Sequence, residues 1–221
     1  MNILVIGHDS NLNECSAKFG TNHQYTLAKH QQDAQKFFGA AQVIFDFVIQ
    51  ENPSQIDVYK SNQKSVVFLN TSTITLAQLT SQVNHSINCT LLGFCGMPTF
   101  LNRELLEVSL RSEADLIQLQ QICKNLSTDY VIVDDRVGLV TPRVICMIIN
   151  EAYYTVQEGT ASREDIDIAM KLGTNYPFGP FDWCERIGIR NVYQLLDSVY
   201  LDTKDERYKI CQLMSLECFL R

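Results

Sequence analysis

The sequence predicts an α/β protein in two parts, a doubly wound α/β domain followed by an all-helical domain. The first observation is the apolar run from Met1 to Gly7, which ends in glycine as the first buried strand of such a sheet does. The second is an alternation of short apolar runs with amphipathic stretches up to about residue 133. The third is continuous helical periodicity after Pro142. We place the domains at 1–136 and 137–221.

In the α/β part, short apolar runs of strand length predict buried strands at 1–7, 24–28, 41–49, 65–69, 91–94 and 130–133. Amphipathic stretches between them predict helices at 11–20, 53–64 and 111–126. Strands alternating with helices are typical of a largely parallel sheet covered on both faces.

Local signals divide the helical part. Pro142 suits the first turn of a helix, and Gly159 ends that helix. Ser162 is expected to cap the next helix, with Asp165 three residues later as a capping-box variant. Gly173 stands where a left-handed C-cap is expected.

Composition and charge exclude several classes. The net charge of −7 argues against a protein that binds the phosphate backbone of nucleic acids. No apolar run approaches the roughly 18 residues that span a bilayer. The first strand begins at Met1 without a charged and apolar leader, so we expect a cytoplasmic protein.

The chain has 8 cysteines, which is many for a cytoplasmic protein. No pair has CxxC spacing, and no histidine completes a zinc-type set, so no metal site is predicted. Most of these cysteines have apolar neighbours, as Cys123 and Cys146 do. We expect free, buried thiols that pack as small hydrophobic side chains.

The turn after the first strand differs from a dinucleotide-binding turn, which reads G-x-G-x-x-G. Gly7 provides the first glycine, but Asp9 and Leu12 occupy the other two positions. A side chain and a negative charge there oppose the approach of a pyrophosphate. Lys29 and His30 follow the second strand, where an acidic residue would hold the adenosine ribose. A plain strand-to-helix turn without a phosphate role remains an alternative.

Residues 138–183 contain, in order, the strings GLVTPR, EA, DIDIAMKLG and YPFGP. These strings resemble the C-terminal helical domain of the NAD-dependent 3-hydroxyacyl-CoA dehydrogenases. The resemblance continues weakly into residues 1–40 and clearly from about residue 40 onward. It implies a reduced Rossmann-like N-terminal domain, NAD as cofactor, an acyl-CoA or other small ligand, and a homodimer through the helical domain.

The resemblance also assigns site residues. It places Ser72 at the position of a serine that touches the substrate, and Glu107 at that of the glutamate that orients the catalytic histidine. Counting back twelve residues from Glu107 reaches Cys95, so a thiol stands at the histidine position. Ser72 as a turn residue and Glu107 as a strand-end carboxylate remain alternatives. Pro142 replaces a family asparagine.

On the cofactor side, the resemblance assigns Gly7, Asp9, Glu51 and Asn70. Imidazole suits proton transfer because its ordinary pKa lies near neutral pH, whereas a thiol is mostly protonated there. Three hypotheses follow. The chain is a degenerate relative with impaired NAD binding and a lost general base, an active dehydrogenase with altered catalytic residues, or a protein with a Cys95-dependent thiol activity.

Overall fold

The structure is a computed structural model that describes residues 1–62, 64–81 and 87–220. The chain divides into two compact units, Met1–Leu139 and Val140–Arg221. Each is described here by itself.

In the described residues, the N-terminal unit holds a sheet of seven strands in the order β2-β1-β3-β4-β5-β6-β7. Strands β1 to β5 pair in parallel, β6 is antiparallel to β5, and β7 is parallel to β6. This is the predicted α/β architecture. The strands are β1 (Asn2–Ile6), β2 (Gln24–Ala28), β3 (Val43–Asp46), β4 (Val66–Asn70), β5 (Leu91–Phe94), β6 (Leu105–Leu110) and β7 (Asp129–Ile132).

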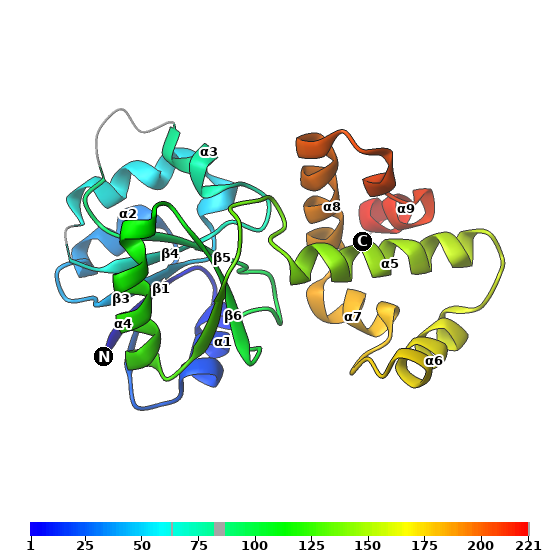
Figure 1. The fold of residues 1–221 in the computed structure, drawn as a ribbon, viewed down its shortest axis with the longest axis horizontal. Helices are drawn as coiled ribbons and strands as arrows, with labels where there is room; N and C mark the ends of the chain where they lie inside the picture. Colours follow the sequence, from blue (N-terminus) through cyan, green and yellow to red (C-terminus); the bar gives the residue numbers. More distant parts are fainter. Residues whose placement is uncertain (63, 82–86, 221) are drawn as a thin grey trace. The chain divides into compact units, whose positions relative to one another are not determined.

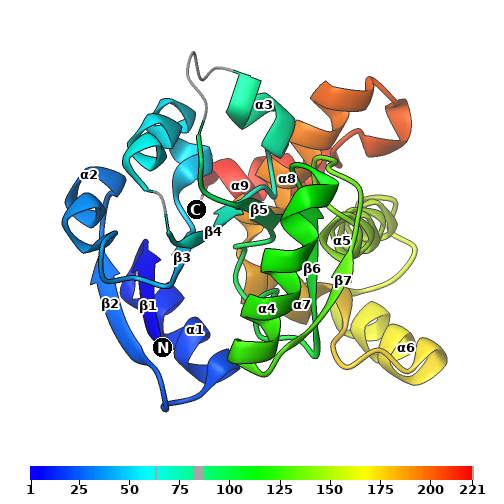
Figure 2. The ribbon, with the colours of Figure 1, turned by 60° about the vertical axis from the view of Figure 1, so that its left-hand side comes forward.

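Helices cover both faces of the sheet (Figures 1 and 2). On one face, α1 and α4 pack against alternate strand residues such as Val5, Phe45 and Phe68. On the other face, α2, α3 and the 3-10 segments pack against Ile6, Ile44 and their neighbours. The helices of this unit are α1 (Asp9–Phe19), α2 (Gln31–Ala34), η1 (Gln35–Phe37), η2 (Ile49–Glu51), η3 (Pro53–Ser61), α3 (Leu76–Ser81), η4 (Glu113–Asp115) and α4 (Leu116–Leu126).

Three element predictions need correction. The strand predicted at 41–49 is only Val43–Asp46, because the Asp46 carboxylate accepts the Val48 N–H at 3.0 Å and turns the chain. The helix predicted from residue 111 begins later, because the Ser112 N–H donates to Asp115 Oδ2 at 3.1 Å and caps the first turn. The segment predicted as helix at 53–64 is a 3-10 helix over Pro53–Ser61.

The C-terminal unit is helical, with α5 (Thr141–Gln157), α6 (Arg163–Thr174), α7 (Pro180–Ile187), α8 (Ile189–Thr203), η5 (Glu206–Tyr208) and α9 (Gln212–Leu220). The Ser162 hydroxyl caps α6 by accepting the Asp165 N–H at 3.2 Å, as predicted. The predicted C-cap at Gly173 is wrong. The helix continues to Thr174, and Asn175 adopts the left-handed conformation (φ 57°) because asparagine tolerates it better than most residues.

The family-like strings around residues 165–180 have a structural role in this unit. Asp167 accepts hydrogen bonds from the Phe181 and Asp182 N–H groups at 2.8 and 3.1 Å, so α6 caps the start of α7. A Cβ on Gly179 would lie 2.2 Å from the Asp167 carboxyl carbon. The glycine therefore lets the carboxylate reach the helix terminus.

The last helix, α9, is fastened to α5 by buried polar groups. Asn150, which is 2% exposed, accepts the Cys211 N–H at 2.9 Å and donates to the Lys209 carbonyl at 2.9 Å. The Glu217 carboxylate forms a salt bridge with Arg163 and accepts a hydrogen bond from the Tyr153 hydroxyl at 3.2 Å. All eight cysteines of the chain are buried thiols outside any disulfide, as predicted.

Candidate functional site at the carboxyl edge of the sheet

Most of the predicted site residues lie at one edge of the sheet. Gly7 and Asp9 follow β1, Asn70 ends β4 and Ser72 lies two residues beyond it, and Cys95 follows β5. Because β1, β4 and β5 belong to the parallel part of the sheet, their carboxyl ends meet at this edge. Ligands of open α/β sheets bind at such edges.

In the turn after β1, the Asn11 side chain folds back onto the backbone. Gly7 has φ +153°, and a Cβ there would lie 2.6 Å from Asn11 Oδ1, so the glycine is required. Asn11 Oδ1 accepts the His8 N–H at 2.8 Å. Asp9 is the first residue of α1 and is exposed, so a carboxylate stands at the positive end of the helix. Leu12 packs against the core beneath.

Asn70 is the centre of a buried hydrogen-bond cluster. Its Nδ2 donates to the Phe47 carbonyl at 2.9 Å, and its Oδ1 accepts the Gly96 N–H at 2.9 Å. The Ser72 hydroxyl lies within donating distance of Asn70 Oδ1 (2.9 Å) and of Gln50 Oε1 (2.7 Å). Ser72 is 0% exposed, so its hydroxyl is satisfied inside the unit.

Gly96 allows the loop after β5 to lie against this cluster. A Cβ on Gly96 would lie 2.7 Å from the Asn70 amide carbon and 2.9 Å from its nitrogen. The close approach keeps residue 95 at the edge, beside the end of β4.

Cys95 and Glu107 are neighbours across two strands. Phe94 pairs with Val108 in the antiparallel β5–β6 register. Glu107 is the next residue on β6, and Cys95 directly follows the end of β5. Glu107 is half-buried, while Cys95 is 5% exposed. Burial raises the pKa of the Cys95 thiol far above its ordinary value, and the negative charge of Glu107 raises it further.

The structure adds Glu14, which sequence reasoning did not single out. Glu14 lies on α1, and its charge also raises the pKa of Cys95. Burial raises the pKa of Glu14 itself, opposed by backbone N–H groups of the 99–102 loop, those of Asn102, Leu101 and Thr99. Its Oε1 is buried and has no hydrogen-bond partner among the described residues. In the sequence, Glu14 could have been found as a carboxyl group next to Cys15 on the inner side of an amphipathic helix.

Asp46 is a second addition, a carboxylate with 0% exposure at the end of β3. Tyr59 donates its hydroxyl to Asp46 Oδ2 at 2.7 Å, and the Gln31 amide lies 3.1 and 3.2 Å from the two carboxylate oxygens. Burial raises the pKa of Asp46 to about 6, against the opposing effect of the Tyr59, Gln31 and Val48 donors. In the sequence, an aspartate inside the apolar run 41–49 could have indicated a buried carboxylate with hydrogen-bond partners.

A cavity of about 200 Å³ opens beside Asp46, between the ends of β2 and β3. One wall is residues 30–32, and the other includes Val48 and Glu51. Glu51, predicted on the cofactor side, therefore lines a cavity at this edge.

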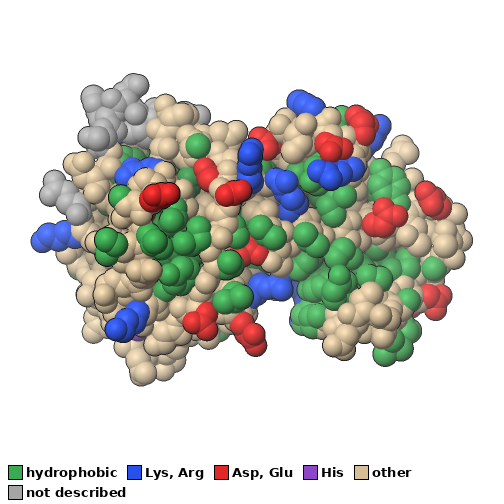
Figure 3. Space-filling view, in the orientation of Figure 1, with side chains coloured by type: hydrophobic (Ala, Val, Ile, Leu, Met, Phe, Trp, Pro, Cys, Tyr) green, Lys and Arg blue, Asp and Glu red, His purple; other side chains and the backbone are tan. Residues whose placement is uncertain are grey.

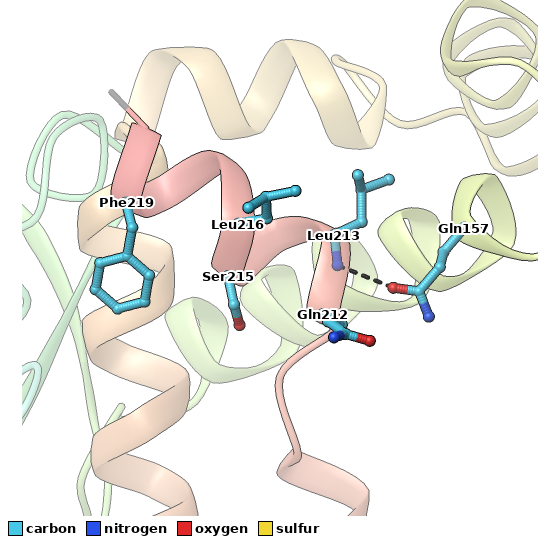
Figure 4. Close-up of a pocket in the computed structure, with 6 residues that line it drawn as sticks. All are labelled: Gln157, Gln212, Leu213, Ser215, Leu216 and Phe219. Atoms are coloured by element: carbon cyan, nitrogen blue, oxygen red, sulfur yellow. Dashed lines mark hydrogen bonds between the residues drawn. The ribbon is translucent and has the colours of Figure 1, made fainter.

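The C-terminal unit has a groove of its own, of about 430 Å³, along α9 and the end of α5. Figure 4 shows Gln157 accepting the Leu213 N–H (2.9 Å), with Leu216 and Phe219 along the same helix. Leu216 and Phe219 are 56% and 73% exposed. Hydrophobic side chains also gather over α5 and α7 on the face drawn in Figure 3.

Within residues 1–62, 64–81 and 87–220, no group of three or more His, Cys, Asp or Glu side chains could hold a metal ion. The same residues contain no helix long and apolar enough to cross a membrane.

Comparison with known proteins shows similarity to one enzyme family. The profile of the "3-hydroxyacyl-CoA dehydrogenase, C-terminal domain" matches residues 138–217. The 3-hydroxyadipyl-CoA dehydrogenase of Escherichia coli (strain K12) is 41% identical over 86 residues, 39% of this chain and 18% of the relative. The probable 3-hydroxybutyryl-CoA dehydrogenase of Bacillus subtilis (strain 168) is 24% identical over 180 residues, 79% of this chain and 63% of the relative. The chain thus spans less than two thirds of the length of these curated relatives.

Solved structures show the same fold. FadB2 of M. tuberculosis superposes with a TM-score of 0.78 at 17% identity, covering 99% of this chain and 93% of that one. The (S)-3-hydroxybutyryl-CoA dehydrogenase PaaH1 from Ralstonia eutropha gives 0.74 at 18% identity, covering 97% and 92%.

The fold and the edge geometry define a two-part protein, a Rossmann-like α/β unit followed by an all-helical unit. Residues 138–217 match the C-terminal domain of the 3-hydroxyacyl-CoA dehydrogenase family, and the chain is similar to members of that family over a longer stretch, which supports the predicted resemblance.

Proposed function

We propose that this chain is a 3-hydroxyacyl-CoA dehydrogenase-like protein of acyl-CoA metabolism that keeps the scaffold but has lost efficient hydride transfer. The observation that carries the proposal is Cys95. At the position that the family resemblance assigns to the general base, this chain has a thiol that is 5% exposed, with a pKa raised by burial and by Glu107.

The reaction explains why this substitution matters. Oxidation of a 3-hydroxyacyl-CoA removes the hydroxyl proton to a base while a hydride leaves the same carbon for NAD. A neutral thiol has no proton-accepting capacity comparable to imidazole, and burial holds Cys95 neutral. Losing a positioned general base typically lowers the rate by about 10²–10⁴-fold.

The turn after β1 supports impaired NAD binding. In a dinucleotide-binding turn, backbone N–H groups and the helix terminus face the pyrophosphate. Here the His8 N–H already donates to the Asn11 side chain, and the Asp9 carboxylate lies at the start of α1. The first removes a donor and the second opposes another negative group, so we expect NAD to bind weakly.

Glu14 favours a second candidate, an active NAD-dependent dehydrogenase with altered catalytic residues. Its carboxyl group has a raised pKa and acts electrostatically on Cys95. A carboxylate with a raised pKa is a competent general base, so Glu14 is the residue that would replace the histidine in that case. The thiol hypothesis is the least supported, because burial outweighs the Met97 N–H and Arg103, which favour a Cys95 thiolate.

Steady-state kinetics with 3-hydroxybutyryl-CoA and NAD separate these candidates. The proposal expects turnover at background level, unchanged by Glu14→Gln or by Cys95→Ser. Turnover that Glu14→Gln abolishes and Cys95→Ser leaves intact would establish the second candidate. Turnover that only Cys95→Ser abolishes would establish a thiol-dependent activity. A titration of protein with NADH, followed by nucleotide fluorescence, should show no saturation in the micromolar range.

The homodimer is also a proposal, supported by exposed apolar side chains of the helical unit. Val144, Ile168 and Leu172 are 53%, 52% and 83% exposed. Side chains of this kind on one unit are typical of a surface covered by a partner. Light scattering at micromolar concentration should give twice the chain mass of 25.2 kDa, and Leu172→Glu should lower it. A monodisperse monomer of wild-type protein would contradict the dimer.

Two further expectations belong to the same proposal. The formal charge of −7 supports a protein that binds no nucleic acid, and we propose a cytoplasmic location. Fluorescence anisotropy with labelled duplex DNA at low salt, and imaging of a tagged chain in its host, test these two points.

A further inference from the structure

The segment 96–104, which we call the strap, connects β5 to β6 and has little backbone support of its own. It lies outside the helices and strands. Among the described residues, one backbone–backbone hydrogen bond forms within it, from the Phe100 N–H to the Met97 carbonyl at 3.2 Å. Segments with few such bonds open locally at a lower free energy than the strands of a core. The conformation of the strap therefore depends on its side chains and on its neighbours.

Apolar packing holds the middle of the strap against the α/β unit. Met97, Phe100 and Leu101 are all buried. Leu101 belongs to the core cluster on the face of the sheet that α1 and α4 cover. The Arg103 guanidinium lies over the Phe100 ring, 5.7 Å from its centroid. These contacts join the middle of the strap to its far end, so that the strap can move as one piece.

Polar contacts fix the two ends of the strap. At the first end, the Gly96 N–H donates to Asn70 Oδ1 at 2.9 Å. At the second end, the Lys18 ammonium on α1 donates to the carbonyls of Arg103 and Glu104, the latter at 3.2 Å. Hydrogen bonds from a charged donor are stronger than those between neutral groups. Lys18 therefore stabilises the strap in its closed position.

Two features oppose the closed position. Thr99 has φ 76°, a conformation that is strained for a β-branched residue and is common in segments that switch. Glu14 lies one helical turn before Lys18 on α1 and faces the strap, since burial raises its pKa against the effect of strap N–H groups. Its Oε1 is buried and has no hydrogen-bond partner among the described residues. A buried polar atom of this kind costs free energy as long as the strap stays closed.

We propose that the strap is a gate at the carboxyl edge of the sheet, which opens and closes as one unit, with Lys18 favouring the closed state and Glu14 the open state. The strap begins beside Asn70 and Cys95, at the edge where ligands of open α/β sheets bind. Its opening separates Gly96 from Asn70 and exposes that edge to solvent. The inference goes beyond the proposed function and does not depend on it, because it concerns the protein without any ligand.

Amide hydrogen exchange of the full chain, followed by NMR at neutral pH, measures the opening. The amides of Gly96 and Phe100 are hydrogen-bonded in the closed strap, so they report on two of its points. We expect equal protection factors at these two amides, far below those of amides in β4 and β5. Unequal protection factors would contradict opening as one unit. Protection equal to that of β4 would show that the strap opens only when the whole unit unfolds, and would also overturn the proposal.

Two variants should shift this equilibrium in opposite directions. Lys18→Met keeps the aliphatic stem and removes the ammonium, so both protection factors should fall about tenfold or more. Glu14→Gln keeps the size of the side chain and removes the charge, so both should rise about threefold or more. Lys64→Met and Glu113→Gln are matched controls at exposed positions outside the strap and should change neither amide.

Three results with these variants would overturn the proposal. Lys18→Met could leave both amides unchanged, or Glu14→Gln could lower their protection. Amides of β4 could also lose protection in parallel with the strap amides in Lys18→Met, which would indicate a general loss of stability. None of these results would alter the case for lost hydride transfer, because hydrogen exchange is measured on the free protein.

Discussion

Asp46→Asn isolates the energetic cost of a carboxylate buried beside the cavity that His30, Gln31 and Glu51 line. Asp46 has 0% exposure, and its pKa is raised from 3.8 to about 6. At 1.36 kcal/mol per pKa unit, this rise corresponds to about 3 kcal/mol by which the native state favours the protonated over the ionised carboxyl. The asparagine keeps the size of the side chain and does not ionise. It has a single oxygen, which can replace either the Val48 acceptor Oδ1 or the Tyr59 acceptor Oδ2, so a constant loss is expected on top of the pH-dependent difference.

The sign of the pH dependence follows from linkage. Because the pKa of Asp46 is higher in the folded than in the unfolded chain, its stabilising contribution is fully present below about pH 3.8. That contribution is lost as the pH rises through about 6. The free energy of unfolding of wild type, minus that of Asp46→Asn, should therefore fall by about 3 kcal/mol between about pH 4 and about pH 8.

Chemical denaturation at steps across this pH range measures the difference. Asp33→Asn is a matched control, because Asp33 lies on α2 nearby and is exposed. The control should stay within about 0.5 kcal/mol of wild type throughout. A wild-type minus Asp46→Asn difference that is constant with pH, or that rises with pH, would refute the assignment of a buried carboxylate with a raised pKa.

Other predictions concern the edge and the helical unit. Gly96→Ala should destabilise the chain by about 1–3 kcal/mol, because the new Cβ would lie 2.7 Å from the Asn70 amide carbon. Gly39→Ala, with nothing within 4 Å, should be neutral, and equal effects of the two changes would contradict this packing. Because Cys95 is buried, it should react with a thiol reagent at neutral pH only as fast as the chain opens locally. Mass spectrometry of timed samples measures this rate, and immediate labelling of Cys95 would disprove its burial. Asp167→Ala should lower the free energy of unfolding by about 1–2 kcal/mol through loss of the α7 cap. Asp167→Asn keeps one of the two accepting oxygens and should lose less, and equal losses would count against the cap.

Sequence reasoning predicted the fold class because its signals are local and periodic. The run from Met1 to Gly7 becomes β1 and its turn, and the residues around Ser162 form the predicted cap. The predicted ends of strands and helices were wrong where a single side chain ended an element against the periodic pattern. Asp46 ends a strand that its apolar neighbours would continue, and Asn175 rather than Gly173 takes the left-handed C-cap.

The site was predicted only in part, because its remaining members meet through the tertiary fold. Cys95 and Glu107 could be paired by their spacing and by the family resemblance. Glu14 approaches them only through the packing of α1 against the loop after β5, as its effect on the pKa of Cys95 shows. The hydrogen bond between Gln31 and Asp46 likewise forms only because β2 and β3 lie on either side of β1. No pattern along the chain specifies such distances.

The rate of a single hydride transfer is the most direct measure of whether this chain has lost its general base. Protein in molar excess over NADH, mixed with acetoacetyl-CoA, reports a single transfer of hydride without any influence of product release. We expect a rate at least about 10²-fold below that of a histidine-bearing relative measured in the same instrument. An equal rate, at nucleotide concentrations that saturate both proteins, would contradict it.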